Sequence, residues 1–382
     1  MQVRIELRRD AGRIGPSSGP WIRRKQIARV QGLETPDALA EIVTRKGETL
    51  GWGLLSPESA IAVRMLGFGP EPLPSDWLER RLAAAVAARE VLGLGREDTT
   101  GYRLVNSEGD GLPGLVVDRY DEDLVLQITT APMVARRARI EAFFATRGHV
   151  HVVLPPGAAK HEGFEPGVSR AHDAPTLRFR EHGLSFETPA PPSQKTGAYF
   201  DQRENRRWVA RLAAAHGGAL LDVGCHIGGF ALHAARAGVR AVGVDASTVV
   251  LEHATRNAEA SGLEGLTWVE ADMFGPLEAP PLAGPFGTIV LDPPKVATNK
   301  NNVDKAVDAM RRLVGRVTPR LAPRGHLVLC SCSHHLGWDH LDRVMVRGRW
   351  ARVATLGAGP DHPVMPSHRE GEYLRVAVYQ PR

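Results

Sequence analysis

From about residue 193 onward, short apolar runs alternate with segments in which apolar residues recur every three or four positions. The runs predict strands over 219–224, 239–245, 266–272, 288–294 and 326–332, with helices between them. Strands that alternate with helices favour a parallel, doubly wound sheet, because each crossover helix returns the chain to the same end of the sheet. Two later runs, ARVATLG and YLRVAVYQ, predict an antiparallel pair. We therefore expect a Rossmann-like α/β domain over 189–382.

The first 72 residues show a different pattern, in which short runs rich in β-branched residues are separated by turn residues. These runs predict strands over 3–7, 38–45, 49–55 and 60–66, and hence a small β-rich domain over 1–72. A helix is predicted over 73–90, where Ser75 or Asp76 is suited to cap it. We expect this helix, within a linker over 73–100, to bridge two domains through one apolar face: Trp77, Leu78, Leu82, Ala85 and Val86.

Residues 101–188 predict a small α+β domain. The pattern indicates a hairpin within 114–130, a helix over 133–148, a strand over 149–156 and a second hairpin over 177–188. The first hairpin is expected to turn around Asp121-Glu122-Asp123, and the second at His182-Gly183. Three prolines within 189–192 then make a stiff segment, which we interpret as the boundary with the last domain.

The overall composition limits the class of protein. A chain of 382 residues, 43% hydrophobic and 24% charged, is typical of a globular protein of two or three domains, and excludes wholesale disorder, a collagen or a coiled coil. No apolar run approaches the ~20 residues that span a bilayer, and MQVRIELRRD lacks the apolar core of a secretory signal. Three cysteines cannot form a disulfide framework. We expect a cytoplasmic protein without a membrane partner.

The net charge of +5 and the pI of about 9.3 suit a polyanionic partner such as nucleic acid. Lysine, however, accounts for only seven of the 48 basic residues. An excess of Arg, Ala, Gly and Pro over Lys is also what a GC-rich genome produces. Charge alone therefore leaves a nucleic-acid partner as one of two open alternatives.

Glycines and acidic residues follow the predicted strands of the last domain. Gly224 and Gly228 stand at the turn after the first strand, where the absence of a Cβ lets a ligand approach the backbone. Their spacing, G-x-x-x-G-G, is not the dinucleotide pattern G-x-G-x-x-G, which disfavours hydride chemistry. Asp222, Asp245 and Asp272 end three successive strands. Acids there suit S-adenosyl-L-methionine, which offers a cationic amino acid part, ribose hydroxyls and an adenine amine.

The fourth strand ends in Leu291-Asp292-Pro293-Pro294-Lys295. The two prolines stiffen a loop that holds Asp292 at the edge of the sheet, where its carboxylate is suited to accept a hydrogen bond from the exocyclic amine of a base. Lys295 is suited to meet a phosphate or a base carbonyl in RNA.

The fifth strand ends near Cys332, which alternation places on the same face as Cys330 and nearer the ligand-binding edge. A thiolate there can add to carbon 6 of a pyrimidine, which activates carbon 5 for methylation. Cys225 and Cys330 fit buried structural roles better. Cys330-x-Cys332-x-His334 has no second ligand pair, so we expect no metal site.

These residues belong to an ordered set of motifs that covers most of the chain. The chain resembles the bacterial 23S rRNA large-subunit methyltransferase I family, which are S-adenosylmethionine-dependent cytosine-5 methyltransferases. The resemblance rests on GYRLVNSEGDGLPGLVVDRY (101–120), KTGAYFDQRENR (195–206), DVGCHIGGFALHAA (222–235), AVGVD (241–245), LDPPK (291–295), SCSHH (331–335), DHPV (361–364) and EYLRVAVYQ (372–380). It implies a PUA-type RNA-binding domain at the N-terminus, a small middle domain that helps to grip RNA, and a class I methyltransferase domain.

The resemblance also implies residue roles. Cys332 would be the nucleophile, Asp292 would orient the base, and Lys195 and Lys295 would contact RNA. The implied cofactor-binding residues are Phe200, Gln202, Arg203, Asp222, Gly224, Gly228, Asp245 and Asp272. The glycine loop departs from the usual family pattern Ser-Tyr-x-Gly-Gly in its Gly224-Cys225-His226-Ile227 stretch, which leaves its detailed contacts in question.

Two alternatives remain open from the sequence. One is a base-nitrogen methyltransferase that uses the Asp292-Pro293-Pro294 loop without a cysteine nucleophile. The other is an RNA-binding assembly factor whose cofactor site is vestigial, against which the three intact strand-end acids argue. The base that removes the carbon-5 proton is either Asp292 or an ordered water. The oligomeric state, a homodimer included, is also open.

Overall fold

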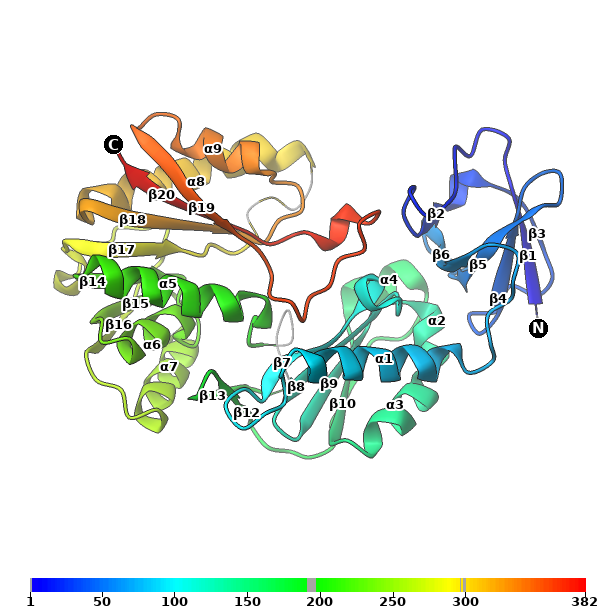
Figure 1. The fold of residues 1–382 in the computed structure, drawn as a ribbon, viewed down its shortest axis with the longest axis horizontal. Helices are drawn as coiled ribbons and strands as arrows, with labels where there is room; N and C mark the ends of the chain where they lie inside the picture. The colour runs from blue at the N-terminus through cyan, green and yellow to red at the C-terminus, as the bar shows by residue number, and fades with distance from the viewer. Residues whose placement is uncertain (1, 191–196, 296, 298–299) are drawn as a thin grey trace.

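The computed structural model describes residues 2–190, 197–295, 297 and 300–382. Three larger sheets and one two-stranded hairpin follow one another along the chain. The six-stranded first sheet lies at one end of the molecule, the seven-stranded sheet lies at the other, and the five-stranded sheet lies between them (Figure 1). No helix of the described part is long and apolar enough to span a membrane.

The first sheet has six strands in the order β2-β6-β5-β4-β1-β3. The strands are β1 (Gln2–Leu7), β2 (Trp21–Arg23), β3 (Ile27–Gln31), β4 (Leu39–Val43), β5 (Thr49–Leu55) and β6 (Ile61–Phe68). The four predicted strands of this region are confirmed. The structure adds β2 and β3, which are too short or too exposed to show an apolar run.

Helix α1 (Trp77–Val91) joins the first sheet to the second. Asp76 occupies the capping position, but its carboxylate accepts from Arg80 rather than from the backbone. The predicted apolar face is confirmed, since Trp77, Leu78 and Leu82 are fully or almost fully buried. They belong to one core cluster that also contains residues of both neighbouring sheets, such as Leu54, Leu66, Leu104 and Leu115. The helix therefore bridges the two units as predicted.

The second sheet has the order β11-β10-β9-β8-β7. Its elements are β7 (Gly101–Asn106), β8 (Leu115–Tyr120), β9 (Asp123–Ile128), α2 (Ala131–Val134), α3 (Arg137–Ala145), β10 (His149–Leu154), α4 (Pro156–Glu162) and β11 (Gly167–Ser169). The hairpin around 121–123 is confirmed. The single helix predicted over 133–148 is instead two helices. Ala135 and Arg136 separate them, and the guanidinium of Arg136 donates to the carbonyl of Pro132 in the first turn of α2 and to that of Asp37 in the first domain.

The second predicted hairpin is formed by β12 (Thr176–Glu181) and β13 (Leu184–Pro189). Its aromatic side chains are buried in a cluster with Tyr120 of the second sheet and with Phe200 and Ile227 of the last region. Phe179 contacts the rings of Tyr120 and Phe200 edge-on. The hairpin thus shares its core with the regions on both sides of it.

The third sheet has seven strands in the order β16-β15-β14-β17-β18-β20-β19. They are β14 (Ala219–Val223), β15 (Ala241–Asp245), β16 (Leu266–Glu270), β17 (Phe286–Leu291), β18 (Leu321–Ser331), β19 (Trp350–Leu356) and β20 (Arg375–Pro381). The first five are parallel, and β20 lies antiparallel between β18 and β19. The predicted α/β class and the antiparallel terminal pair are confirmed.

Helices cover both faces of this sheet (Figure 1). They are α5 (Arg203–His216), α6 (Gly229–Arg236), α7 (Thr248–Ala260), α8 (Val303–Val317) and α9 (Trp338–Met345). The buried residues of α8 and α9 form one core, and those of α5 and α6 form another. Helix α9 was not predicted. The sheet is therefore doubly wound, with its parallel strands ending at one common edge.

The segment between β19 and β20 leaves this sheet and returns to the other units (Figure 1). Asn106 of the second unit donates to the carbonyl of Pro363, and the ring of Trp21 in the first unit lies 4.4 Å from that of His368. This segment therefore contacts all three units of the chain.

Candidate active site

A cavity of about 960 Å³ opens at the edge where the parallel strands end. Its wall contains seven of the predicted site residues: Gln202, Gly224, Asp245, Asp272, Asp292, Lys295 and Cys332. The second sheet closes the opposite side with Arg103, Val116 and Gln127. In an open parallel sheet, ligands bind in the crevice beyond the carboxyl ends of the strands, and the cavity occupies that position.

Gly224 lets the turns after β14 and β17 approach each other. It has a φ of +84°, and a Cβ built on it would lie 2.5 Å from the backbone oxygen of Asp292. Any other residue would therefore strain the backbone and push Asp292 out of place. Gly228 also has a positive φ, but it does not line the cavity. Its missing Cβ makes room for the indole of Trp268.

Asp245 and Asp272 present carboxylates that backbone amides orient. Asp245 accepts from the amides of His226 at 3.0 Å and Ser247 at 3.1 Å, and Asp272 accepts from the amide of Phe274 at 2.9 Å. A carboxylate has room for about four hydrogen bonds, so both retain acceptor positions. Their place on the cavity wall suits the hydroxyl and amine donors of a nucleoside.

Asp222 lies beneath the wall rather than on it, because its side chain is fully buried. One carboxylate oxygen accepts from the amide of Ala231 at 3.2 Å, and Oδ1 has no hydrogen-bond partner among the described residues. Burial, with added repulsion from Asp292, raises the pKa of Asp222 to about 7. A buried carboxylate oxygen without a partner fits a cationic donor, so the donor set agrees with a ligand that carries an amino group.

Phe200 and Arg203, to which the resemblance assigned cofactor contacts, do not line this cavity. They come from the 3-10 turn η4 (Phe200–Gln202) and the start of α5. The ring of Phe200 packs against Tyr120 in the shared aromatic cluster. The guanidinium of Arg203 is fully buried and binds Asp361 at 2.7 and 3.1 Å. Their roles in this structure are therefore to fix the turn from which Gln202 projects.

Gln202 contacts Asp292 directly. Its amide nitrogen donates to Asp292 Oδ2 at 3.1 Å, and its amide oxygen accepts from Asn205 at 2.7 Å. Gln202 is 3% exposed, so this chain of hydrogen bonds is shielded from solvent. The arrangement holds one oxygen of the Asp292 carboxylate against the protein.

Of the three thiols, Cys332 is the one on the cavity wall. It follows the last residue of β18 and is partly exposed. Cys330 is fully buried within β18, and burial raises its pKa well above the ordinary value. Cys225 is also buried, and its pKa is raised by burial in the same way. Cys332, the thiol that the sequence analysis singled out, is therefore the one that a ligand in the cavity would contact.

The structure describes one of the two lysines that are predicted to contact RNA. Lys295 is exposed and lies on the cavity wall. Lys195 lies outside the described residues.

Several wall residues were not predicted. The second sheet and the segment before β20 supply Arg103, Gln127, Glu370 and Tyr373, and His334 follows Cys332. His334 was within reach of the sequence, because it stands two positions after the predicted nucleophile. Arg103 and Tyr373 lie in two of the stretches that carry the family resemblance, but no role was expected for them, and Gln127 and Glu370 lie outside those stretches.

Comparison with known proteins agrees with this layout. Residues 6–68 match the model of a PUA-like domain, and residues 220–316 match that of a methyltransferase domain. A protein of Deinococcus radiodurans named ribosomal RNA large subunit methyltransferase is 34% identical, with 94% of this chain and 93% of that protein covered. A ribosomal RNA large subunit methyltransferase I of Shewanella amazonensis is 32% identical over 99% of each chain.

Solved structures show the same fold. A putative methyltransferase crystallised with SAH superposes with a TM-score of 0.81 over 100% of both chains, at 16% identity. A putative SAM-dependent methyltransferase from Streptococcus mutans gives a TM-score of 0.79 over 99% of both chains, at 15% identity.

Proposed function

The chain belongs to the ribosomal RNA large subunit methyltransferase family, and on this premise we propose that it methylates 23S rRNA with S-adenosyl-L-methionine. We propose further that the product is 5-methylcytosine, formed through a covalent adduct between Cys332 and carbon 6 of the base. The observation that carries this proposal is that Cys332 and Asp292 line one cavity together with Asp245 and Asp272.

The residues of this cavity would hold the cofactor by its three parts. Asp245 and Asp272 retain acceptor positions for ribose hydroxyls and the adenine amine, and the unpartnered oxygen of Asp222 suits the amino group. When bound, S-adenosyl-L-methionine supplies an electrophilic methyl group on a sulfonium centre.

Asp292 and Cys332 would divide the work on the base. Asp292 accepts a hydrogen bond from the exocyclic amine of cytosine, in the position that Gln202 holds for it. The Cys332 thiolate adds to carbon 6, which gives carbon 5 the electron density of an enamine. After carbon 5 is methylated, loss of its proton restores the carbon 5–carbon 6 double bond and expels the thiolate. Asp292 or a water molecule takes that proton.

The other units suit an RNA substrate. The first sheet matches a PUA-like domain, and the second sheet supplies Arg103 and Gln127 to the cavity wall. Lys295 is exposed beside the cavity, where its ammonium group is suited to a phosphate. The net charge of +5 favours association with the RNA backbone.

Replacement of Cys332 tests the mechanism. We expect Cys332→Ala to abolish transfer of methyl groups to cytosine carbon 5 in 23S rRNA, measured by mass spectrometry of the digested nucleosides. We also expect RNA that contains 5-fluorocytosine at the target to trap the unchanged enzyme, because fluorine at carbon 5 cannot leave as a proton does. The matched control is Cys330→Ala, which should methylate and be trapped.

Other outcomes would favour the alternatives. A Cys332→Ala enzyme that still methylates a ring or exocyclic nitrogen would support a base-nitrogen methyltransferase that relies on Asp292. A chain that binds rRNA but shows no heat of binding with S-adenosyl-L-methionine would support a non-catalytic assembly factor. Unchanged 5-methylcytosine in 23S rRNA from a deletion strain would contradict the proposed product.

A further inference from the structure

Three histidines surround one carboxylate at the edge of the second sheet, outside the cavity described above. Strands β9 and β10 pair in parallel with His149 opposite Asp123. His151 lies two positions further along β10, so it faces the same side of the sheet as His149. Strand β11 pairs with β10 on its other side, and the loop after it carries His172. Three neighbouring strands thus bring these four side chains together.

The side chains are within bonding reach of one another. His151 Nε2 lies 2.9 Å from Asp123 Oδ1, and His172 Nε2 lies 2.7 Å from the same oxygen. His149 Nδ1 is 3.6 Å from it. The ligand atoms of Asp123, His151 and His172 all lie within 4.8 Å of one another.

The cluster is sheltered on one side and open on the other. The side chain of His151 is 4% exposed and that of Asp123 is 17% exposed, whereas His172 and His149 are 32% and 55% exposed. A metal ion could therefore enter from solvent and still be held against a buried ligand. Arg170 donates to the carbonyl of Ala174, which closes the loop that carries His172.

We propose that Asp123, His151 and His172 form a binding site for a divalent transition metal of the zinc type, with His149 or a water as the fourth ligand. Two imidazoles and a carboxylate are the donor set that zinc prefers where thiolates are absent. Zinc needs nitrogen ligands at about 2.0–2.1 Å, so the three side chains must close around the ion by small rotations.

Binding of an ion would move a proton within each of two imidazole rings. His151 and His172 each accept a backbone amide on Nδ1, from Ala171 at 3.4 Å and Ala174 at 3.3 Å, so Nε2 carries the proton. Coordination through Nε2 moves each ring proton to Nδ1 and breaks these two long contacts. The amides of Ala171 and Ala174 are therefore reporters of metal binding.

The position of the proposed metal site indicates a structural role rather than a role in methyl transfer. Asp123 begins β9, whereas Gln127, four residues further along the same strand, lines the active-site cavity. A bound ion would tie β9, β10 and the loop after β11 together at the end of the sheet away from that cavity. The sequence-based expectation of no metal site considered only the pattern around Cys330 and Cys332. The zinc site proposed here does not depend on the methyltransferase function.

Calorimetric titration with zinc chloride tests the site. The protein is the full chain without a tag, and EDTA first removes any bound metal. We expect one zinc ion per chain with a Kd at or below about 1 μM. Asp123→Asn and His172→Ala should each weaken binding at least about tenfold, and His149→Ala should weaken it less. His161→Ala is the matched control, because His161 is exposed on α4 of the same unit, and it should bind as the unchanged chain does.

Two further measurements show whether the metal ion binds at this cluster rather than elsewhere on the chain. Cobalt(II) should give visible d–d bands without a sulfur-to-metal charge-transfer band, because no cysteine belongs to the site. Zinc should shift the amide resonances of Ala171 and Ala174 in the unchanged chain and not in His172→Ala. Zinc affinity that is the same in His172→Ala and in the unchanged chain, or a charge-transfer band with cobalt, would overturn the proposal. Absence of measurable zinc binding would overturn it as well.

Discussion

Gln202 is a single buried side chain that positions the carboxylate of Asp292 through a hydrogen bond. It joins Asn205 to Asp292 by two hydrogen bonds, and all three residues are fully or partly buried. The hydrogen bond from Gln202 constrains the orientation of the Asp292 carboxylate at the cavity wall. Without Gln202, Asp292 would lose this constraint, and its repulsion with Asp222 would favour rotation.

We predict that Gln202→Ala lowers kcat for methyl transfer by about 10- to 100-fold, because positioning of a catalytic group is worth roughly this much. The KM for S-adenosyl-L-methionine should change little, since the substitution acts on Asp292. Steady-state assays with labelled cofactor measure both constants. Gln380→Ala, which removes a half-buried glutamine on β20 that donates to the carbonyl of Arg324, should leave both unchanged. A larger change in KM than in kcat would show that Gln202 acts on the cofactor instead.

The sequence placed correctly those cavity-lining residues that stand directly at strand ends. Asp245, Asp272, Asp292 and Cys332 follow recognisable apolar runs, and the parallel sheet brings them to one edge. Arg203 could not be placed in this way, because the partner that turns it away from the cavity, Asp361, lies 158 positions along the chain.

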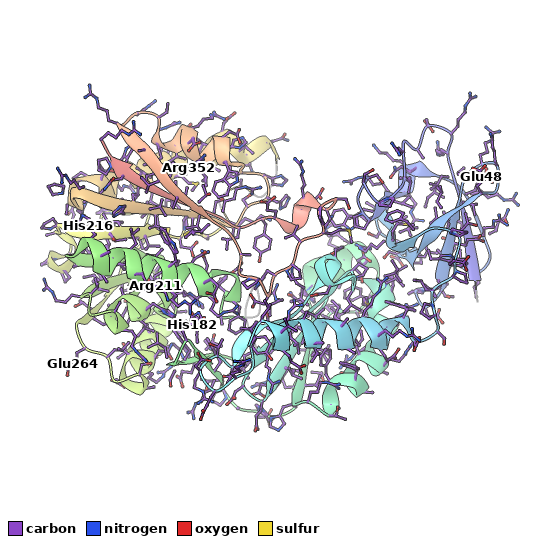
Figure 2. All side chains as sticks on the ribbon, in the orientation of Figure 1. Glu48, His182, Arg211, His216, Glu264 and Arg352 are labelled. Atoms are coloured by element: carbon purple, nitrogen blue, oxygen red, sulfur yellow. The ribbon has the colours of Figure 1, made fainter. Side chains whose placement is uncertain are left out.

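At the scale of elements, one buried carboxylate of the hairpin β12–β13 binds two helices of the last domain. Glu181 accepts from Arg206 of α5 at 2.7 Å and contacts His233 of α6 at 2.9 Å. His182, labelled in Figure 2, follows it at the turn and lies 3.3 Å from Glu204. Burial works to raise the pKa of Glu181, but Arg206 and His233 outweigh it and bring the pKa down to about 2.

We predict that Glu181→Ala lowers the free energy of unfolding by about 3–5 kcal/mol, because Arg206 would remain buried without its counter-charge. Urea unfolding followed by circular dichroism measures the change. Glu264→Ala, an exposed substitution labelled in Figure 2, should have almost no effect.

The lowered pKa of Glu181 sets the pH range over which its ion pair with Arg206 stabilises the fold. The ion pair stabilises the fold fully above about pH 4.5, the ordinary pKa of the group, and the stabilisation is lost as the pH falls through about 2. Equal stability losses in Glu181→Ala at pH 7 and pH 2 would contradict the ionic explanation.

Helices and strands were predicted correctly where one hydrophobic pattern dominated a segment, and they were missed where no such pattern did. The runs that became β14, β15 and β17 are buried on both faces, so they read as continuous apolar segments. Strand β3 has one fully buried residue, Ile27, and helix α9 is only eight residues long. Such short, mostly polar segments take their structure from pairing partners that local sequence does not reveal.

At the scale of the whole molecule, the first sheet is held to the second unit by a buried ion pair. Arg64 of β6 binds Glu162 of α4 at 2.8 Å, and the side chains are 8% and 4% exposed. Ser56 also donates to Glu162 at 2.7 Å. Together with the shared core around α1, these contacts make the PUA-like domain a fixed part of the molecule.

We predict that Arg64→Ala loosens this attachment, because Glu162 would be left buried without a cation. Limited proteolysis between residues 69 and 76 should become at least about tenfold faster, as the population of the opened form rises. Arg80→Ala, which breaks an exposed pair with Asp76, should cleave at the original rate. Equal cleavage rates in the two variants would show that the apolar contacts of α1 alone hold the domains.

The position of β20 has a consequence for the synthesis of the molecule. Strand β18 presents Cys332 at its end, and β20 covers one of its two edges. Because β20 spans 375–381, a nascent chain that has emerged only as far as β19 leaves that edge of β18 bare and β19 without its partner. The sheet next to Cys332 is therefore completed only when β20 has been synthesised. A nascent chain that lacks β20 would carry the strand-end residues of the cavity on an incomplete sheet.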